Sequence, residues 1–185
     1  MSGDSVPWTL ALARIPSSDR EATNLFRELR KPLLRYLMCL GLSSDEAQDV
    51  VQEAFLSLHR HLSSGGSQEN IRSWLFRVAH NRARNWQASY ERRFGEPLDD
   101  PGAASALAAS ALDDATPERM LLEKEKFERL GKAIRTLAGA ERECLLLRAS
   151  GLRYREIGEV LGIATSTVAD TVDRAVKKLA EKCNV

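Results

Sequence analysis

The chain has 185 residues, 43% of them hydrophobic and 29% charged, with a formal net charge of +1. This is the balance of a soluble globular protein. It has no apolar run of membrane-spanning length and no basic-then-apolar signal-peptide start, so we expect a cytoplasmic protein without membrane insertion. The three cysteines are far apart and in no Cys-x-x-Cys pair. They indicate neither a disulfide framework nor a zinc site, and we expect no metal and no cofactor.

The charges are distributed in three blocks. Residues 1–94 carry a net charge of +3, residues 95–128 carry −6 and residues 129–185 carry +4. Two mildly basic blocks around an acidic stretch suit a chain that meets a polyanion at two places. They also favour two small domains over one large domain.

The N-terminal block is predicted to begin with two helices. Apolar residues recur at steps of three and four over residues 22–40, which is one face of a helix, and Pro32 should mark a kink or a break in it. Ser43 and Glu46 have the spacing of a capping box. This box opens a second helix, which has a wide apolar stripe over residues 47–62.

A loop and a third helix complete this block. Residues 63–67 are three serines and two glycines, which favour neither regular state and predict a loop. The third helix is expected from Ile71 into the low nineties, with an inner side formed by Leu75, Val78, Ala79 and Trp86. No alternating strand pattern of useful length occurs, so the predicted fold class is all-α.

Residues 95–116 have the composition of a flexible linker. They contain two prolines, two glycines, seven alanines and five acidic residues, but no basic residue. Thr116 followed by Pro117 is the pattern of an N-cap with proline at the first helical position, so a second domain is expected to start there. We therefore predict domains at residues 8–94 and 117–183.

The C-terminal domain is predicted to contain a helix-turn-helix. Glycines separate three helical segments, which are residues 141–149, Tyr154–Leu161 and a longer helix from Thr165 onward. In this layout the first residues of the last helix reach base edges in the major groove, and flanking basic residues contact phosphates. The candidate DNA-binding residues are Arg153, Arg155, Thr165, Ser166, Thr167, Arg174, Lys177 and Lys178. Asp170 and Asp173 would oppose phosphate binding, and a helical hairpin that packs against another protein is the alternative.

The third helix of the N-terminal block is rich in arginine and aromatic residues. Residues 72–94 contain six arginines, one acidic residue and five of the eleven aromatic residues, a combination suited to single-stranded nucleic acid. Arg77, Asn81 and Arg84 fall on one face by their spacing and are the functional candidates. Most of the aromatic residues, including both tryptophans, are instead expected in the core.

The second helix carries the opposite charge. Asp45, Asp49 and Glu53 recur every four residues and form an acidic ridge beside Gln52. A solvated helix face and a docking surface for a basic partner are both compatible with this pattern.

Three motifs together resemble those of bacterial sigma factors. Residues 45–55, Asp-Glu-Ala-Gln-Asp-Val-Val-Gln-Glu-Ala-Phe, resemble their second conserved region. Residues 74–81, Trp-Leu-Phe-Arg-Val-Ala-His-Asn, look like the start of their promoter −10 helix, and residues 151–168 are similar to their −35 helix-turn-helix. The motif order and the 22-residue linker match the small extracytoplasmic-function (ECF) group over about residues 8–182.

The resemblance implies a transcription initiation factor with two helical domains, regions 2 and 4, joined by the linker. Region 4 would grip the flap of core RNA polymerase, and the clamp would be bound by Asp45, Asp49, Gln52 and Glu53. Residues 63–70 would receive a base flipped from the −10 strand. Nearby promoter DNA would be held by Arg72, Arg77, Asn81 and Arg84. An anti-sigma factor that covers the polymerase-binding faces is a further expected partner.

The chain departs from the family pattern at several positions. In the −10 helix, His80 and Asn85 stand where the family usually has Arg and Asp. In the reading helix, Ala169 and Thr171 stand where Lys and Arg are common, and Val176 replaces another Arg. We therefore predict weak or unusual −35 recognition.

Three other functions are the alternatives. A helix-turn-helix regulator that binds duplex DNA as a dimer would share the C-terminal pattern, but it explains neither the acidic ridge nor the basic helix. An enzyme is not expected, because His59 and His61 diverge on a helix and no phosphate loop or catalytic triad occurs. A structural adaptor leaves the clustering of arginines unexplained.

Overall fold

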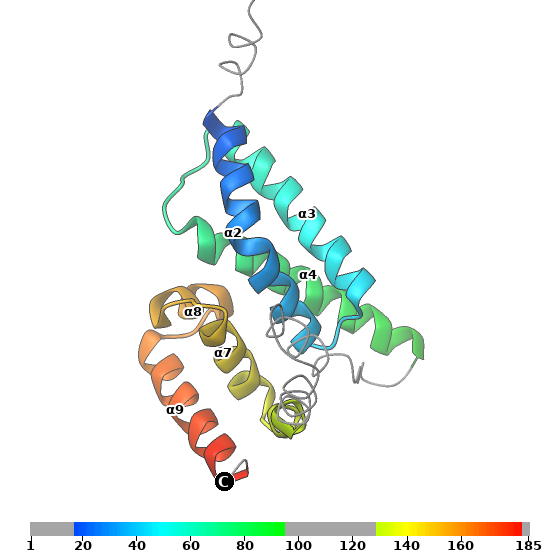
Figure 1. The fold of residues 1–185 in the computed structure, drawn as a ribbon, viewed down its shortest axis with the longest axis vertical. Helices are drawn as coiled ribbons and strands as arrows, with labels where there is room; N and C mark the ends of the chain where they lie inside the picture. The colour runs from blue at the N-terminus through cyan, green and yellow to red at the C-terminus, as the bar shows by residue number, and fades with distance from the viewer. Residues whose placement is uncertain (1–16, 95–128, 183–185) are drawn as a thin grey trace, which may run out of the picture.

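The computed structural model describes residues 17–94 and 129–182, and every regular element within them is a helix (Figure 1). The N-terminal unit consists of α2 (Ser17–Cys39), α3 (Ser44–Ser63) and α4 (Ile71–Phe94). The C-terminal unit contains a helical end at 129–135, followed by α7 (Gly139–Ala149), α8 (Tyr154–Leu161) and α9 (Thr165–Lys182). The predicted all-α class is confirmed. The predicted linker, with the N-cap expected at its end, lies outside the described residues.

Local sequence signals explain the bounds of the N-terminal helices. Pro32 lies inside α2, which continues to Cys39. Of the two outcomes predicted for this proline, a kink or a break, the break is therefore wrong. The predicted capping box at the start of α3 is confirmed. The Ser43 amide donates to Glu46 Oε2 at 2.8 Å, and the Glu46 amide donates to Ser43 Oγ at 3.4 Å. Both bonds satisfy amides that the start of a helix would otherwise leave without partners.

The three N-terminal helices form a bundle in which α4 runs across α2 and α3 (Figure 1). Its centre is made of aliphatic side chains at helical spacing, and the fully buried ones include Leu33, Leu37, Leu58 and Leu75. Full burial of one such side chain contributes about 1.5–3 kcal/mol. This layer packs α4 against the other two helices.

The C-terminal unit contains the predicted helix-turn-helix. α8 ends at Gly162, whose φ of 69° is the left-handed conformation that glycine adopts most easily. α9 then begins at Thr165 and buries Val168, Val172 and Ala175. α7, the first of the three helical segments predicted here, begins two residues earlier than predicted. Because one face of α9 packs against its own unit, the opposite face and the first turn stay in solvent.

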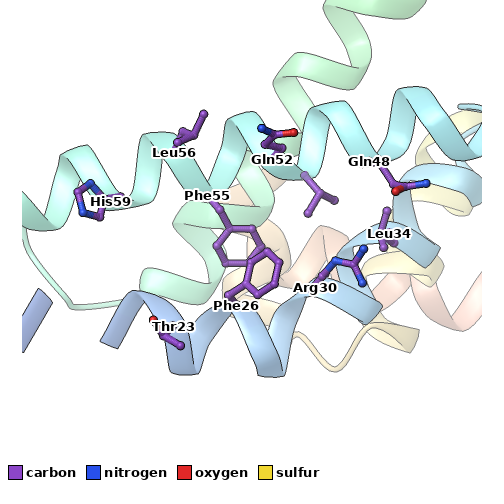
Figure 2. Close-up of a pocket in the computed structure, with 10 residues that line it drawn as sticks. Thr23, Phe26, Arg30, Leu34, Gln48, Gln52, Phe55, Leu56 and His59 are labelled. Carbon is purple, nitrogen blue, oxygen red and sulfur yellow. The ribbon is translucent and has the colours of Figure 1, made fainter. Parts of the chain in front are cut away.

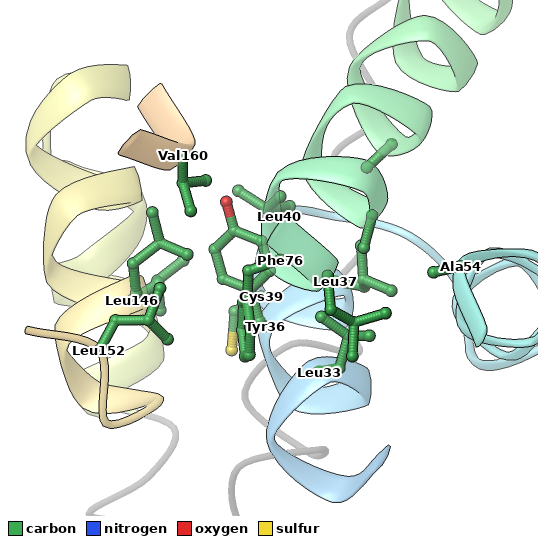
Figure 3. Close-up of a cluster of buried hydrophobic side chains, with 14 of the residues drawn as sticks. Leu33, Tyr36, Leu37, Cys39, Leu40, Ala54, Phe76, Leu146, Leu152 and Val160 are labelled. Atoms are coloured by element: carbon green, nitrogen blue, oxygen red, sulfur yellow. The ribbon is translucent and has the colours of Figure 1, made fainter. Parts of the chain in front are cut away.

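The two units pack against each other through one hydrophobic core (Figure 3). Leu146, Leu152 and Val160 of the C-terminal unit face Tyr36 and Phe76 of the N-terminal unit, and all five side chains are buried. Along this contact α4 lies against α8. The described residues therefore form a closed arrangement in which the helix-turn-helix touches the basic helix.

Candidate polymerase and promoter interface

The acidic ridge lies on the exposed side of α3. All four of its residues are exposed, namely Asp45, Asp49, Gln52 and Glu53. Glu53 forms an ion pair with Arg82 of α4, and Arg82 also donates to the Ser57 hydroxyl at 3.3 Å. These contacts tie the ridge to α4 beside a hollow of about 390 Å³ between the two helices. Sequence analysis missed the role of Arg82, because its partner lies 29 positions away.

An apolar groove of about 610 Å³ runs between α2 and α3 (Figure 2). Phe26 and Leu56 on its walls are 39% and 49% exposed, and the Phe26 ring meets the Phe55 ring edge-on at 4.8 Å between centroids. Exposed apolar surface of this kind marks interaction sites. Gln48 and Gln52 also line the groove, so the groove and the acidic ridge adjoin on α3. The sequence pattern placed Phe26 on the apolar face of α2 but could not show that it stays accessible.

The basic helix α4 presents its candidate residues in two environments. Arg77 and Asn81 are exposed and lie about one helical turn apart. Arg84 is also exposed, and it forms an ion pair with Glu143 of α7 at 3.5 Å. Arg72 pairs with a glutamate of α2 at 3.3 Å. Two of the four candidate side chains are therefore engaged within the protein.

The start of α4 meets the C-terminal unit through one carboxylate. Ser73 Oγ donates to Glu159 Oε2 at 2.6 Å, and Asn70 Nδ2 donates to Glu159 Oε1 at 3.4 Å. Arg155 lies 3.4 Å from the same carboxylate. Glu159 thus binds polar groups of Asn70 and Ser73, at the junction between α4 and the preceding loop. The family resemblance assigns this loop to the −10 strand.

His80, one of the departures from the family pattern, is buried where the two units meet. The Tyr36 hydroxyl lies 2.7 Å from His80 Nδ1. Burial is the main cause that lowers the pKa of His80 and raises the pKa of Tyr36. The tyrosine therefore stays protonated and the imidazole stays neutral, and the two groups share one hydrogen bond. The pair satisfies two polar groups inside an apolar contact without bringing a charge into it.

The helix-turn-helix presents its first turn to solvent. The hydroxyl residues at the start of α9 are exposed, namely Thr165, Ser166 and Thr167. Arg153 and Arg155 at the start of α8 are exposed as well. Short hydroxyl side chains at a helix N-terminus, flanked by arginines, suit contacts to base edges and phosphates.

The basic residues in the later turns of α9 have partners within the protein. Lys177 Nζ lies 2.7 Å from Asp173, and Lys178 Nζ contacts the two carboxylate oxygens of Glu141 at 2.7 and 2.9 Å. Arg174 donates to a buried threonine hydroxyl at 3.2 Å. The hydrogen bond from Lys178 is the main cause that lowers the pKa of Glu141. Both lysine charges are thus neutralised locally, which reduces the attraction of this helix for phosphates.

Across residues 17–94 and 129–182, no group of three or more His, Cys, Asp or Glu side chains is arranged to hold a metal ion. Within the same residues, no helix is long and apolar enough to cross a membrane.

Known families match both halves of the chain. Residues 25–93 match Sigma-70 region 2, and residues 127–179 match Sigma-70 region 4. The ECF RNA polymerase sigma-E factor of Escherichia coli K12 is 29% identical over 174 residues, which cover 91% of this chain and 90% of that protein. The sigma-E factor of Haemophilus influenzae is 28% identical, with 91% of each chain covered.

Two solved structures share the fold. One is the sigma factor RpoE in complex with the anti-sigma factor NepR from Bartonella quintana, with a TM-score of 0.64 and 23% identity over 88% of this chain and 96% of that one. The other is CnrH in complex with the cytosolic domain of CnrY, with a TM-score of 0.61 and 22% identity over 94% of each chain.

The helical bundle with its exposed basic helix, the helix-turn-helix and the two Sigma-70 matches together identify a DNA-binding transcription initiation factor. The region 2 match precedes the region 4 match along the chain. The chain belongs to the extracytoplasmic-function group of RNA polymerase sigma factors. It acts with core RNA polymerase at promoter DNA, and the dimeric regulator is not favoured.

Proposed function

We propose that the acidic ridge docks this sigma factor on core RNA polymerase while α4 and loop 64–70 hold the −10 strand. One observation carries this proposal: the exposed ridge on α3 and the exposed Arg77 and Asn81 lie on different helices, so protein and DNA can be bound at once. Carboxylates orient a basic protein partner, whereas guanidinium groups neutralise phosphates. The chain works in the cytoplasm with the polymerase, by binding rather than by catalysis.

Region 4 supplies the weaker promoter contact. The exposed hydroxyl residues of α9 would meet base edges of the −35 element, and Arg153 and Arg155 would meet phosphates. Lys177 and Lys178 are held by acidic side chains and add little attraction. This arrangement supports the predicted weak −35 recognition. The working units would be residues 8–94 and 117–183, with residues 95–116 as the linker.

The two units would have to separate before the promoter is bound. Glu143 holds Arg84, where a phosphate is expected, and Glu159 holds Ser73 next to Arg72, another residue predicted to contact the promoter. A carboxylate and a phosphate repel each other, and both cannot use the same donor. Polymerase binding to each unit would supply the competing contacts that part them.

An anti-sigma factor is the proposed regulator, and the groove between α2 and α3 is its proposed docking site. One of the two similar solved structures is a complex with the anti-sigma factor NepR, and the other is a complex with the cytosolic domain of CnrY. The apolar face of a helix fits a groove walled by Phe26 and Leu56, and Gln52 would let the same inhibitor reach the acidic ridge. The Leu56→Arg variant is expected to lose an inhibitor that co-purifies with the wild-type chain. The variant is expected to bind core polymerase as the wild type does.

The direct test of polymerase docking is co-elution with purified core RNA polymerase on a sizing column. Asp49→Arg places a positive charge in the centre of the ridge and is expected to abolish co-elution. Glu181→Arg makes the same charge change at an exposed position in the last turn of α9 and is expected to keep it. Co-elution kept in Asp49→Arg would move the docking face elsewhere, and failure of the wild-type chain to co-elute would overturn the proposed function.

A further inference from the structure

The loop between α3 and α4 is packed around one side chain, His61 in the last turn of α3. The imidazole stacks on the Trp74 ring of α4, with 4.7 Å between centroids and 23° between planes. It also lies directly against Gly66, where any Cβ atom would overlap the ring. The imidazole therefore fills the space between the loop and the first turn of α4.

Hydrogen bonds tie the loop backbone to the same residue. His61 Nε2 lies 3.0 Å from the Ser67 carbonyl oxygen, and because a carbonyl only accepts, the imidazole nitrogen donates. The His61 carbonyl accepts from the Gly66 amide at 2.8 Å and from the Ser64 hydroxyl at 2.9 Å. Gly65, with a φ of 76°, lets the chain turn back onto the ring. His61 thus contacts the loop at Ser64, Gly66 and Ser67, and its imidazole makes the contacts with Gly66 Cα and the Ser67 carbonyl.

We propose that His61 is the positioning residue of loop 64–70 and sets how selectively this loop captures a base of the −10 strand. The inference rests on the proposed function, in which the loop receives a flipped base. Ser67, Gln68 and Glu69 are exposed on the loop. The His61 side chain binds the carbonyl oxygen of Ser67, the first of these three residues.

The physical reason is preorganisation. Flipping a base out of its stack costs a few kcal/mol, so the pocket must recover that free energy through well-placed contacts. A loop that is already shaped loses little entropy on binding, whereas a loop that orders only on binding loses affinity for every base. Removal of the imidazole would release the Ser67 carbonyl and the loop beside Gly66, and so reduce the difference between the preferred base and the other three.

The test uses the full chain assembled with core polymerase and a library of fork-junction DNA whose single-stranded −10 segment is randomised. His61→Ala is expected to reduce base enrichment at the captured position by about fivefold, with polymerase binding unchanged. His61→Phe keeps a ring against Trp74 and Gly66 and is expected to restore most of that enrichment. Arg60→Ala, an exposed neighbour on the same helix, is the matched control and is expected to behave as wild type.

A second pair of variants tests the packing itself. Gly66→Ala is expected to lower the enrichment as His61→Ala does, because its Cβ collides with the ring. The double variant His61→Ala with Gly66→Ala has no ring for the Cβ to meet. Its base enrichment is expected to be no lower than that of His61→Ala alone. If His61→Ala does not fold, as judged by thermal unfolding, Gly66→Ala and His61→Phe decide the question.

The outcomes separate this inference from the proposed function. Full enrichment in both His61→Ala and Gly66→Ala would overturn the role of His61. A chain in which Ser67, Gln68 and Glu69 are all replaced by alanine provides the other comparison. If that chain keeps full enrichment, the loop does not capture the base and the proposed function of the loop fails.

Discussion

Glu159 of α8 accepts a hydrogen bond of 2.6 Å from the Ser73 hydroxyl of α4, across 86 positions of the chain. The contact joins the first helix of the helix-turn-helix to the start of the basic helix. The Glu159 side chain is 30% exposed, and in that setting a hydrogen bond to an ionised group contributes about 1 kcal/mol. The closed arrangement therefore depends mainly on the apolar contact beside this bond. The hydrogen bond adds a smaller contribution at the edge of that contact.

Loss of this hydrogen bond should make the two units open more often. Cys39 reports opening, because it is buried in the shared core and burial raises the pKa of its thiol to about 11. In Glu159→Ala, in a Cys183→Ser background, we expect Cys39 to react about fivefold faster with a thiol reagent, measured by mass spectrometry. Asp170→Ala, an exposed change on α9, should leave the rate unchanged. Equal rates in the two variants would mean that Glu159 does not hold the units together.

Phe76 is expected to be a main contributor to stability. Its side chain is fully buried, and its ring lies 5.7 Å from that of Tyr36 between centroids. Phe76→Ala should lower the free energy of unfolding by about 3–5 kcal/mol, measured by urea denaturation, because it leaves a cavity between the units. Val176→Ala, at a side chain 50% exposed, should change it by less than about 0.5 kcal/mol. A small effect of Phe76→Ala would show that the contact between the units is loose.

Tyr36→Phe should destabilise the chain although it removes only one oxygen atom. The change leaves His80 Nδ1 buried without its hydrogen-bond partner, which costs about 1–3 kcal/mol in the free energy of unfolding. Adding His80→Leu removes the unsatisfied nitrogen and should recover part of that loss. The two single variants and the double variant can be compared by urea denaturation. Strict additivity of the two changes would argue against the hydrogen bond.

The pair of Glu141 and Lys178 should make region 4 sensitive to acid. Because the folded pKa of Glu141 is lowered from 4.5, its stabilising effect is complete above that pH and is lost as the pH falls through the lower folded value. Lys178→Met should therefore lower Tm at neutral pH, and the gap to wild type should close in acid. Lys132→Met, at an exposed lysine, provides the comparison in a thermal scan across pH. A gap that persists at the lowest pH would contradict the pairing.

Arg77 is expected to contact the promoter backbone. In the assembled holoenzyme, Arg77→Ala should weaken binding to −10 single strands of every sequence, because one phosphate contact is lost. The slope of log K against log salt should fall by about 0.7. Arg60→Ala removes another exposed arginine, from α3, and should leave the slope unchanged. A variant that changes base preference instead of the salt slope would place Arg77 at a base edge.

Much of the fold could be predicted from the sequence because the signals are local. Apolar spacing of three and four gave the three N-terminal helices, and the capping box at Ser43 depends only on a residue three positions away. Gly162 marked the end of α8 for a similar reason, since its left-handed φ is a property of one residue. The exposed ridge and the exposed positions Arg77 and Asn81 followed from helical periodicity in the same way.

Only the tertiary structure decided which distant side chains meet. His80 is hydrogen-bonded to Tyr36, 44 positions away, and no local sequence pattern around either residue indicates the other as its partner. Phe26 continues the apolar face of α2, yet it stays accessible because the neighbouring helix covers only part of that face. The sequence by itself determined the helices, their order and the class of protein, because periodicity, caps and motifs each depend on residues that lie close together along the chain. The closed contact of α4 with α8 depends instead on how two apolar surfaces fit together, and that fit arises only when the chain has folded.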